Sequence, residues 1–358
     1  YNTFAQRMKD FPVRVDLMCR FRTPAQQKKT IEDTKKGLVD IVIGTHRVLS
    51  DDLKFKDLGL LIIDEEQRFG VQHKEKIKKL KENVDVLTLT ATPIPRTLAL
   101  TVYGDLDISV MKGRPPQRKP VRTLCYTDER RREVYAGLVR QVQAGRQAYV
   151  VCPLIEESDV LAVHSAERVY EELKRDFLQD IPCALLHGRL KGAEKDAIMS
   201  SFAAGELKVL VSTTVIEVGV NVPNATLMVI ENAERFGLAQ LHQLRGRVGR
   251  GSEQSYCVLL TAADSPEALA RLNVLHESED GFYLAEKDME QRGAGQLFGL
   301  KQHGLPDLRI ADIMRDVDVI AQVRQLAQAQ LRTPEDWAEI RRLVEMQFGE
   351  RFNMIFNT

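Results

Sequence analysis

Two arginines stand three positions apart in the segment 243–250, which follows the pattern Q-x-x-G-R-x-G-R. On a helix or a tight turn, Arg247 and Arg250 would point the same way. Gly246 and Gly249 allow a close backbone approach. Two forked guanidinium groups can bind one polyphosphate and neutralise the charge of its transition state. A solvated basic turn is the ordinary alternative, and the spacing is too specific for it.

Acidic residues follow the apolar run at 60–63: Asp64, Glu65 and Glu66, and then Gln67. Open parallel sheets bind ligands at the carboxyl ends of their strands. One carboxylate there can hold Mg²⁺ through its water ligands, and the next can polarise an attacking water in phosphoryl transfer. Alone, an acidic triplet is more often an ordinary loop. Together with the arginine pair it indicates phosphate chemistry.

Hydroxyl and imidazole side chains follow other apolar runs. Thr90 and Thr92 come after the run at 86–89, and Thr213 begins a polar and glycine-containing segment at 213–223. Such hydroxyls can bond carboxylates or nucleic-acid phosphates, although a single segment of this kind is more often a turn. His187 follows a further run, and we interpret it as a structural histidine.

The elements that must position these residues alternate between short apolar runs and amphipathic stretches. Helices are predicted at 129–144, 166–177 and 193–203, and buried strands are predicted at 41–44, 60–63, 86–89, 121–126, 148–152, 183–186, 207–211 and 227–230. This alternation predicts parallel sheets covered on both faces. A linker rich in proline, glycine and basic residues, 112–120, separates two such sheets. From about Ser265 onward the pattern is helical.

Composition fits a globular protein, with 44% hydrophobic and 28% charged residues among 358. No apolar run reaches the roughly 20 residues of a membrane-spanning helix. Five scattered cysteines predict buried thiols, which fits the cytosol. The net charge is zero, which neither supports nor excludes nucleic-acid binding. Charge clusters at 130–132 and 74–81 are interpreted as solvated helix faces, and the stripe from Trp337 to Met346 as core packing.

In this order, the segments resemble the helicase motifs of superfamily 2. The matching segments are 44–47 (motif Ib), 64–67 (motif II), 90–92 (motif III), 185–189 (motif IV), 213–223 (motif V) and 243–250 (motif VI). Two families compete within that superfamily. Residues up to about 90 look closer to the transcription-repair coupling translocase Mfd, whereas 103–107, 154–158, 229–232 and 304–318 look closer to the RecG branch-migration helicase. Residues 280–295 resemble the helical translocation module of both families. The mixture is compatible with one lineage or with a chimaera.

The resemblance implies an α/β fold with two RecA-like parallel-sheet lobes, the first incomplete, followed by a small helical translocation module. The expected domains are 1–113, 114–263 and 264–358. ATP and Mg²⁺ would be the cofactors. Asp64 would hold the metal through water, Glu65 would activate the attacking water, and Gln67 would couple the nucleotide state to DNA. Arg247 and Arg250 would contact the ATP phosphates across the lobe interface, and Gln243, Gly219 and Glu217 would support them.

The DNA-facing residues implied by the resemblance are Thr45, His46, Thr92 and Thr213, and Arg292 would transmit lobe closure to the duplex. The expected partner is double-stranded and branched DNA, held through its phosphates and therefore salt-sensitive. Single-strand-binding protein and RNA polymerase are further candidate partners. The resemblance also implies a monomer in the cytoplasm, associated with the nucleoid.

The sequence departs from the family pattern in two places. No glycine is followed by lysine, so the phosphate-binding loop G-x-x-x-x-G-K-[ST] is absent from these 358 residues. We expect a chain truncated upstream, which alone hydrolyses ATP negligibly. Asn221 also stands where both families usually have aspartate. The alternatives are a motor enzyme, a non-hydrolysing DNA-binding module, and an RNA helicase, which the resemblance at 280–295 disfavours.

Overall fold

The computed structural model describes most of the chain, and the statements below concern that part. It covers residues 1–19, 22–65, 69–70, 73, 76–77, 80, 84–90, 109–111, 113, 118–153, 159–213, 222–262, 265–292, 317–330 and 337–348. Contacts divide the chain into two compact units, Tyr1–Ala91 and Thr92–Thr358. Each unit is described by itself.

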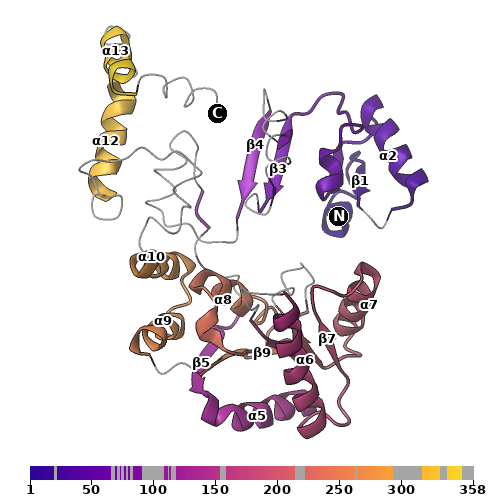
Figure 1. Cartoon of the computed structure of the whole chain (residues 1–358). Coiled ribbons are helices and arrows are strands. Elements are labelled where there is room, and N and C mark those ends of the chain that lie inside the picture. Colours follow the sequence, from indigo (N-terminus) through magenta and orange to yellow (C-terminus); the bar gives the residue numbers. More distant parts are fainter. Residues whose placement is uncertain are drawn as a thin grey trace. The chain divides into compact units, whose positions relative to one another are not determined.

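The first unit contains two short parallel sheets (Figure 1). One pairs β1 (Val15–Met18) with β2 (Ile41–Gly44), and the other pairs β3 (Leu60–Asp64) with β4 (Asp85–Leu89). Its helices are α1 (Asn2–Arg7), α2 (Pro24–Lys36) and the 3₁₀ helix η1 (His46–Leu49). The strands predicted at 41–44, 60–63 and 86–89 are therefore present.

The prediction that these strands are buried is wrong for β4, and in β3 only Ile63 is buried, with 4% of its surface exposed. Leu60 is 55% exposed, Ile62 49% and Leu87 47%. The physical reason is that two paired strands, with no third strand beside them among the described residues, cannot enclose their own side chains.

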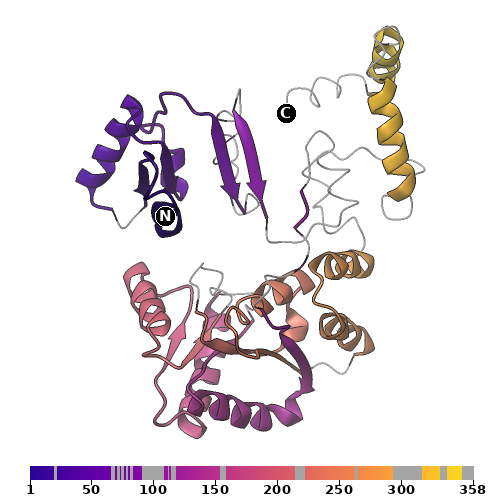
Figure 2. The ribbon, with the colours of Figure 1, turned by 180° about the vertical axis from the view of Figure 1, so that it is seen from behind.

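The second unit is built on one six-stranded parallel sheet of order β5-β10-β9-β6-β8-β7, seen from opposite sides in Figures 1 and 2. Its strands are β5 (Arg122–Thr127), β6 (Gln147–Val151), β7 (Cys183–Leu186), β8 (Val209–Ser212), β9 (Ala225–Ile230) and β10 (Tyr256–Thr261). Strand β10 was not predicted. The central strands β6 and β9 are buried along their whole length, which explains their continuous apolar sequence.

Helices cover both faces of this sheet. The helices are η3 (Asp128–Arg130), α5 (Arg131–Gln143), α6 (Asp159–Asp176), α7 (Gly192–Ala203), η5 (Ala233–Arg235), α8 (Leu238–Arg245), α9 (Pro266–Glu277) and α10 (Gly281–Arg292). One core lies under α5 and α6, and the other lies under α7, α8, α9 and α10. Alternate residues of β9 enter opposite cores, as Val229 and Ile230 do.

Two more helices follow, α12 (Val317–Gln330) and α13 (Trp337–Phe348). The core packing predicted for the stripe on α13 is not found, because Leu343 is 54% exposed and Met346 69%. No helix in the described ranges is long and apolar enough to cross a membrane. All five cysteines are free.

Candidate functional site

In the second unit, the residues that end neighbouring strands lie side by side at the carboxyl edge of the sheet. The amide of Glu231 donates to the carbonyl of Val151 at 2.8 Å, and the amide of Cys152 to that of Ser212 at 2.8 Å. The amide of Thr213 donates to the carbonyl of Leu186 at 3.2 Å. These bonds continue the ladder past the strands, so that the segments at 187, 213, 152 and 231 are neighbours.

Two side chains at this edge lack partners. The hydroxyl of Thr213 and Nδ1 of His187 are buried without a hydrogen bond to any part of the chain the structure describes. Thr213, predicted to face DNA, is only 1% exposed. Its neighbours 214–221 lie outside the described residues, and so do the predicted supporting residues Glu217 and Gly219.

The arginine motif begins on α8 and continues into the turn after it. Helix α8 is anchored by Leu238, Leu241 and Leu244, all in the core under that face of the sheet. Gly246 caps the helix, and Gly249 has a φ of 75°. A Cβ at Gly249 would stand 2.7 Å from the side chain of Val121, so no larger residue fits without movement.

The turn brings Arg247 and Arg250 together. Arg250 donates from Nε to the carbonyl of Gly246 at 3.3 Å. Partial burial lowers the pKa of Arg250, and the positive charge of Arg247 lowers it further. Both guanidinium groups also lie near the hydroxyl of Tyr149, whose pKa burial nevertheless raises to about 12. Two guanidinium groups this close can bind the oxygens of one anion.

Arg245, within the same motif, points elsewhere. It is 3% exposed and donates to the carbonyl of Leu275 at 2.7 Å, to that of Ser278 at 2.9 Å and to the hydroxyl of Thr123 at 3.3 Å. A cation at the C-terminus of α9 also interacts well with the helix dipole. Arg245 therefore joins α8 to the end of α9, a role that the sequence analysis missed.

His242 lies one turn before Arg245, and their side chains are 3.1 Å apart. Burial, and then the charge of Arg245, lowers the pKa of His242 to about 4. The ring is therefore neutral at pH 7. Gln243, predicted to support the arginines, is half-buried on the same helix.

A buried ion pair fixes the end of β9. Glu231 is 2% exposed, and its carboxylate accepts from the hydroxyl of Tyr135 at 2.7 Å and lies 3.1 Å from the guanidinium of Arg131. Burial raises the pKa of Glu231 although Arg131 opposes the shift. The prediction that 130–132 forms a solvated face is therefore wrong for Arg131, because its partner stands a hundred residues away in the sequence.

In the first unit, the predicted magnesium ligand Asp64 is the last residue of β3 and is exposed. Glu65 has a φ of 53°, and its amide donates to the carbonyl of Leu89 at 2.9 Å. An exposed carboxylate at a strand end fits a metal held largely through water. No group of three potential metal ligands occurs among the described residues. Gln67 and Thr92 lie outside them.

The predicted DNA-facing residues Thr45 and His46 follow β2 and are both exposed. A Cβ at Gly44 would stand 2.3 Å from the carbonyl of Met18, so only glycine fits there. Arg47 is held by a two-pronged ion pair with Asp52, both distances being 2.6 Å, and that pairing keeps the pKa of Asp52 well below its usual range.

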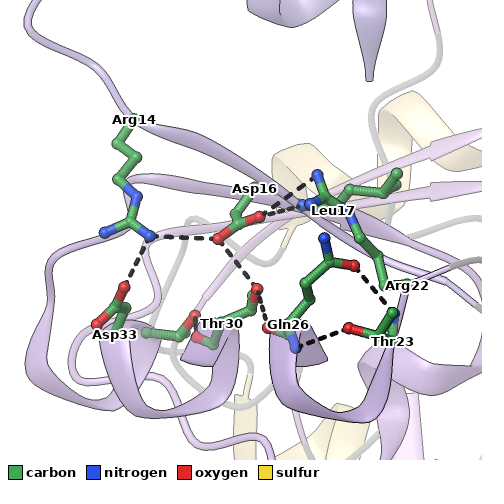
Figure 3. Close-up of polar contacts among 9 residues, drawn as sticks. Arg14, Asp16, Leu17, Arg22, Thr23, Gln26, Thr30 and Asp33 are labelled. Atoms are coloured by element: carbon green, nitrogen blue, oxygen red, sulfur yellow. Dashed lines mark hydrogen bonds and ion pairs between the residues drawn. The ribbon is translucent and has the colours of Figure 1, made fainter. Parts of the chain in front are cut away.

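Two side-chain networks hold β1, α2 and the segment after β2 together. Arg14 donates to Asp33 at 2.7 Å, and Asp16 accepts from Thr30 at 3.0 Å, so that β1 is tied to α2 (Figure 3). Gln27 of α2 accepts from Arg47 at 3.1 Å. Gln27 also donates to the carbonyls of Cys19 and Arg22, at 3.3 and 3.0 Å. The segments after β1 and β2 are thereby linked through one amide.

Three family models match the chain in order. They describe a DEAD/DEAH box helicase over residues 1–101, a helicase conserved C-terminal domain over 130–252, and the C-terminal part of domain 3 of the ATP-dependent DNA helicase RecG over 278–347. Together with the parallel sheets and the arginine motif, these matches define a superfamily 2 helicase with two helicase lobes and a helical extension.

Relatives identify the family within that class. The chain is 46% identical over 325 residues to the ATP-dependent DNA helicase RecG of Thermotoga maritima, covering 91% of this chain and 42% of that protein. It is 46% identical over 314 residues to the RecG of Bacillus subtilis, covering 88% of this chain and 46% of that protein. A structure of RecG bound to a three-way DNA junction matches with a TM-score of 0.70 and 44% identity, over 89% of this chain and 41% of that one. The chain belongs to the RecG family, and it spans less than half the length of these relatives.

Proposed function

We propose that this chain is part of an ATP-driven motor that moves along double-stranded DNA and acts on branched DNA. The observation that carries the proposal is the pair of guanidinium groups at Arg247 and Arg250, brought together by a glycine-containing turn at the end of α8. The solved relative bound to a three-way DNA junction supports branched DNA as the substrate.

The roles follow from the chemistry of the groups. Arg247 and Arg250 would bind the ATP phosphates, with Gln243, Gly219 and Glu217 in support. Bound Mg²⁺ would neutralise phosphate charge, and Asp64 would hold it through water. Glu65 would orient the attacking water. Gln67 would relay the nucleotide state.

Contact with DNA would come from Thr45 and His46, which are exposed in the structure, and from Thr92. The predicted DNA contact of Thr213 remains part of this proposal, although its hydroxyl is buried and has no partner among the described residues. Arg292, the last residue of α10, would pass movement of the lobe to the duplex. The boundaries at 113/114 and 263/264 are part of this proposal.

The test is magnesium-dependent ATP hydrolysis with and without a three-way DNA junction. It should be run on this chain and on a protein in which the upstream half of the Thermotoga maritima relative precedes it. We expect turnover, stimulated by the junction, only in the longer protein. In that protein Arg250→Ala should lower kcat by about 10³-fold or more, as loss of an arginine finger does. The exposed Arg140→Ala, on α5, should leave kcat unchanged.

A non-hydrolysing DNA-binding module is the second candidate, favoured by the absence of a glycine–lysine pair from these 358 residues. It predicts a longer protein that binds the junction but never hydrolyses ATP. That result would replace the motor assignment.

A further inference from the structure

The end of the predicted linker packs against the turn that carries the arginine motif. The side-chain amide of Gln254 donates to the carbonyl of Pro120 at 2.8 Å, and the amide of Arg122 donates to the carbonyl of Ser255 at 2.9 Å. Val121 fills the space left by the missing side chain of Gly249. Residues 120–122 therefore run beside the turn at 249–255, and Arg118 lies two residues before this contact.

Arg118 adds a third positive charge to the arginine pair. It is exposed, and its charge contributes with that of Arg247 to the lowered pKa of Arg250, after the larger effect of burial. The contacts of Pro120 and Arg122 with the turn bring the neighbouring Arg118 close to it, and the electrostatic effect on Arg250 agrees with that position.

Within the described residues, neither Arg118 nor Arg250 forms an ion pair, whereas Arg131 and Arg146 of the same unit do. The turn 246–255 has one acidic residue, Glu253, and it pairs with Arg146 at 2.8 Å. Holding Arg118 and Arg250 near each other with no counter-ion for either among the described residues costs stability, and a bound anion would offset that cost.

We propose that Arg118 is a third binding residue for the phosphate oxygens that Arg247 and Arg250 bind. The inference rests on the proposed function, because it assigns the same ligand to all three side chains. A nucleotide and a DNA backbone both offer phosphate oxygens. We assign the nucleotide, since Arg118 shares its surroundings with Arg250, and binding of DNA by Arg118 is an outcome that the experiment separates.

The experiment measures binding of inorganic tripolyphosphate and of ATP to this chain by calorimetry, and binding of a labelled DNA duplex by fluorescence anisotropy. Arg118→Ala should weaken tripolyphosphate and ATP binding about tenfold, the effect of losing one hydrogen bond to a charged group. Arg118→Lys keeps the charge and should recover much of that loss. Arg140→Ala removes an exposed arginine from α5 and should change nothing.

A double-mutant cycle tests whether the ligand is shared. If Arg118 and Arg250 hold one anion, the loss in Arg118→Ala/Arg250→Ala should differ clearly from the product of the single losses. The proposal is overturned if Arg118→Ala binds tripolyphosphate as the unmutated chain does, if the unmutated chain does not bind it, or if only duplex binding weakens. An effect of Arg250→Ala without one of Arg118→Ala would overturn this inference and leave the proposed function standing, since the latter depends on ATP turnover in the longer protein.

Discussion

The ion pair between Arg131 and Glu231 should respond asymmetrically to loss of either partner. Removing Arg131 leaves a carboxylate that is 2% exposed with Tyr135 as its remaining partner. Breaking a buried pair in this way typically costs about 3–5 kcal/mol. Removing the charge of Glu231 leaves a guanidinium whose side chain is 22% exposed and lies 4.0 Å from Glu172. In Glu231→Gln the loss of unfolding free energy should be about 1–2 kcal/mol, because the glutamine side chain can still accept the hydrogen bond of Tyr135.

The raised pKa of Glu231 supports this order. It shows that burial disfavours the carboxylate more than Arg131 favours it. In Arg131→Met the pKa of Glu231 should rise further, so the folded state would bind the proton more tightly than the unfolded state. The contribution of Glu231 to the unfolding free energy is then fully present at low pH, and it is lost as pH rises through the pKa of Glu231 in the folded state.

Hydrogen exchange followed by mass spectrometry would measure these losses locally, in peptides covering β6 and β9, which the Glu231 amide joins through Val151. The variants are Arg131→Met, Glu231→Gln and the double variant, with Arg140→Met on the same helix as the control. The loss of local stability in the double variant should be close to that in Glu231→Gln alone. Equal losses in the two single variants, or strictly additive losses in the double, would refute the reasoning.

Three further changes test the geometry around α8. The unfolding free energy should fall by roughly 3 kcal/mol as pH drops from 6.5 to 4, because the unfolded state protonates His242 first, and His242→Gln should remove that fall. If this is wrong, urea denaturation will give the same loss of unfolding free energy between pH 7 and 4.5 in the variant and in the unmutated chain. Gly249→Ala should cost about 1–2 kcal/mol in thermal unfolding, from its positive φ and its contact with Val121; wild-type stability would contradict this. Arg245→Leu should cost about 3 kcal/mol by orphaning carbonyls such as that of Leu275, with faster exchange confined to the last turn of α9; unchanged exchange there would exclude the assigned role.

Continuous apolar runs were sufficient to predict five of the six strands in the sheet of the second unit, and β10 is the strand they missed. The strand predicted at 183–186 has those bounds in the structure, and the one predicted at 227–230 lies within β9. The reason is physical: a parallel strand covered on both faces needs apolar residues at every position. At 86–89 the same pattern predicted the strand correctly and its burial wrongly, because a run of apolar residues does not say how many strands lie beside it. Among the described residues, strand β4 pairs with β3 alone, and it is exposed.

The arginine motif could be recognised from its spacing. The burial and the partners of single arginines could not be predicted. Arg131 stands in a run of three arginines, and nothing local marks it as half-buried beside Glu231. Arg245 is the last residue of α8, whereas Arg247, two positions later, lies in the turn that follows the helix. Arg118 stands in a segment predicted to be a linker. In each case the deciding contact is with a residue far away in the sequence, which local spacing does not specify.

What surrounds each guanidinium separates the structural arginines of the second unit from those that we propose to bind phosphate. Arg131 and Arg146 pair with carboxylates, and Arg245 donates to carbonyls, so that their charges are satisfied within the fold. Arg250 is partly buried next to like charges, and Arg118 joins it without a described counter-ion. Such an arrangement is destabilising for the protein alone and becomes favourable when an anion binds. If the proposed phosphate binds there, it should therefore stabilise the turn by relieving that repulsion.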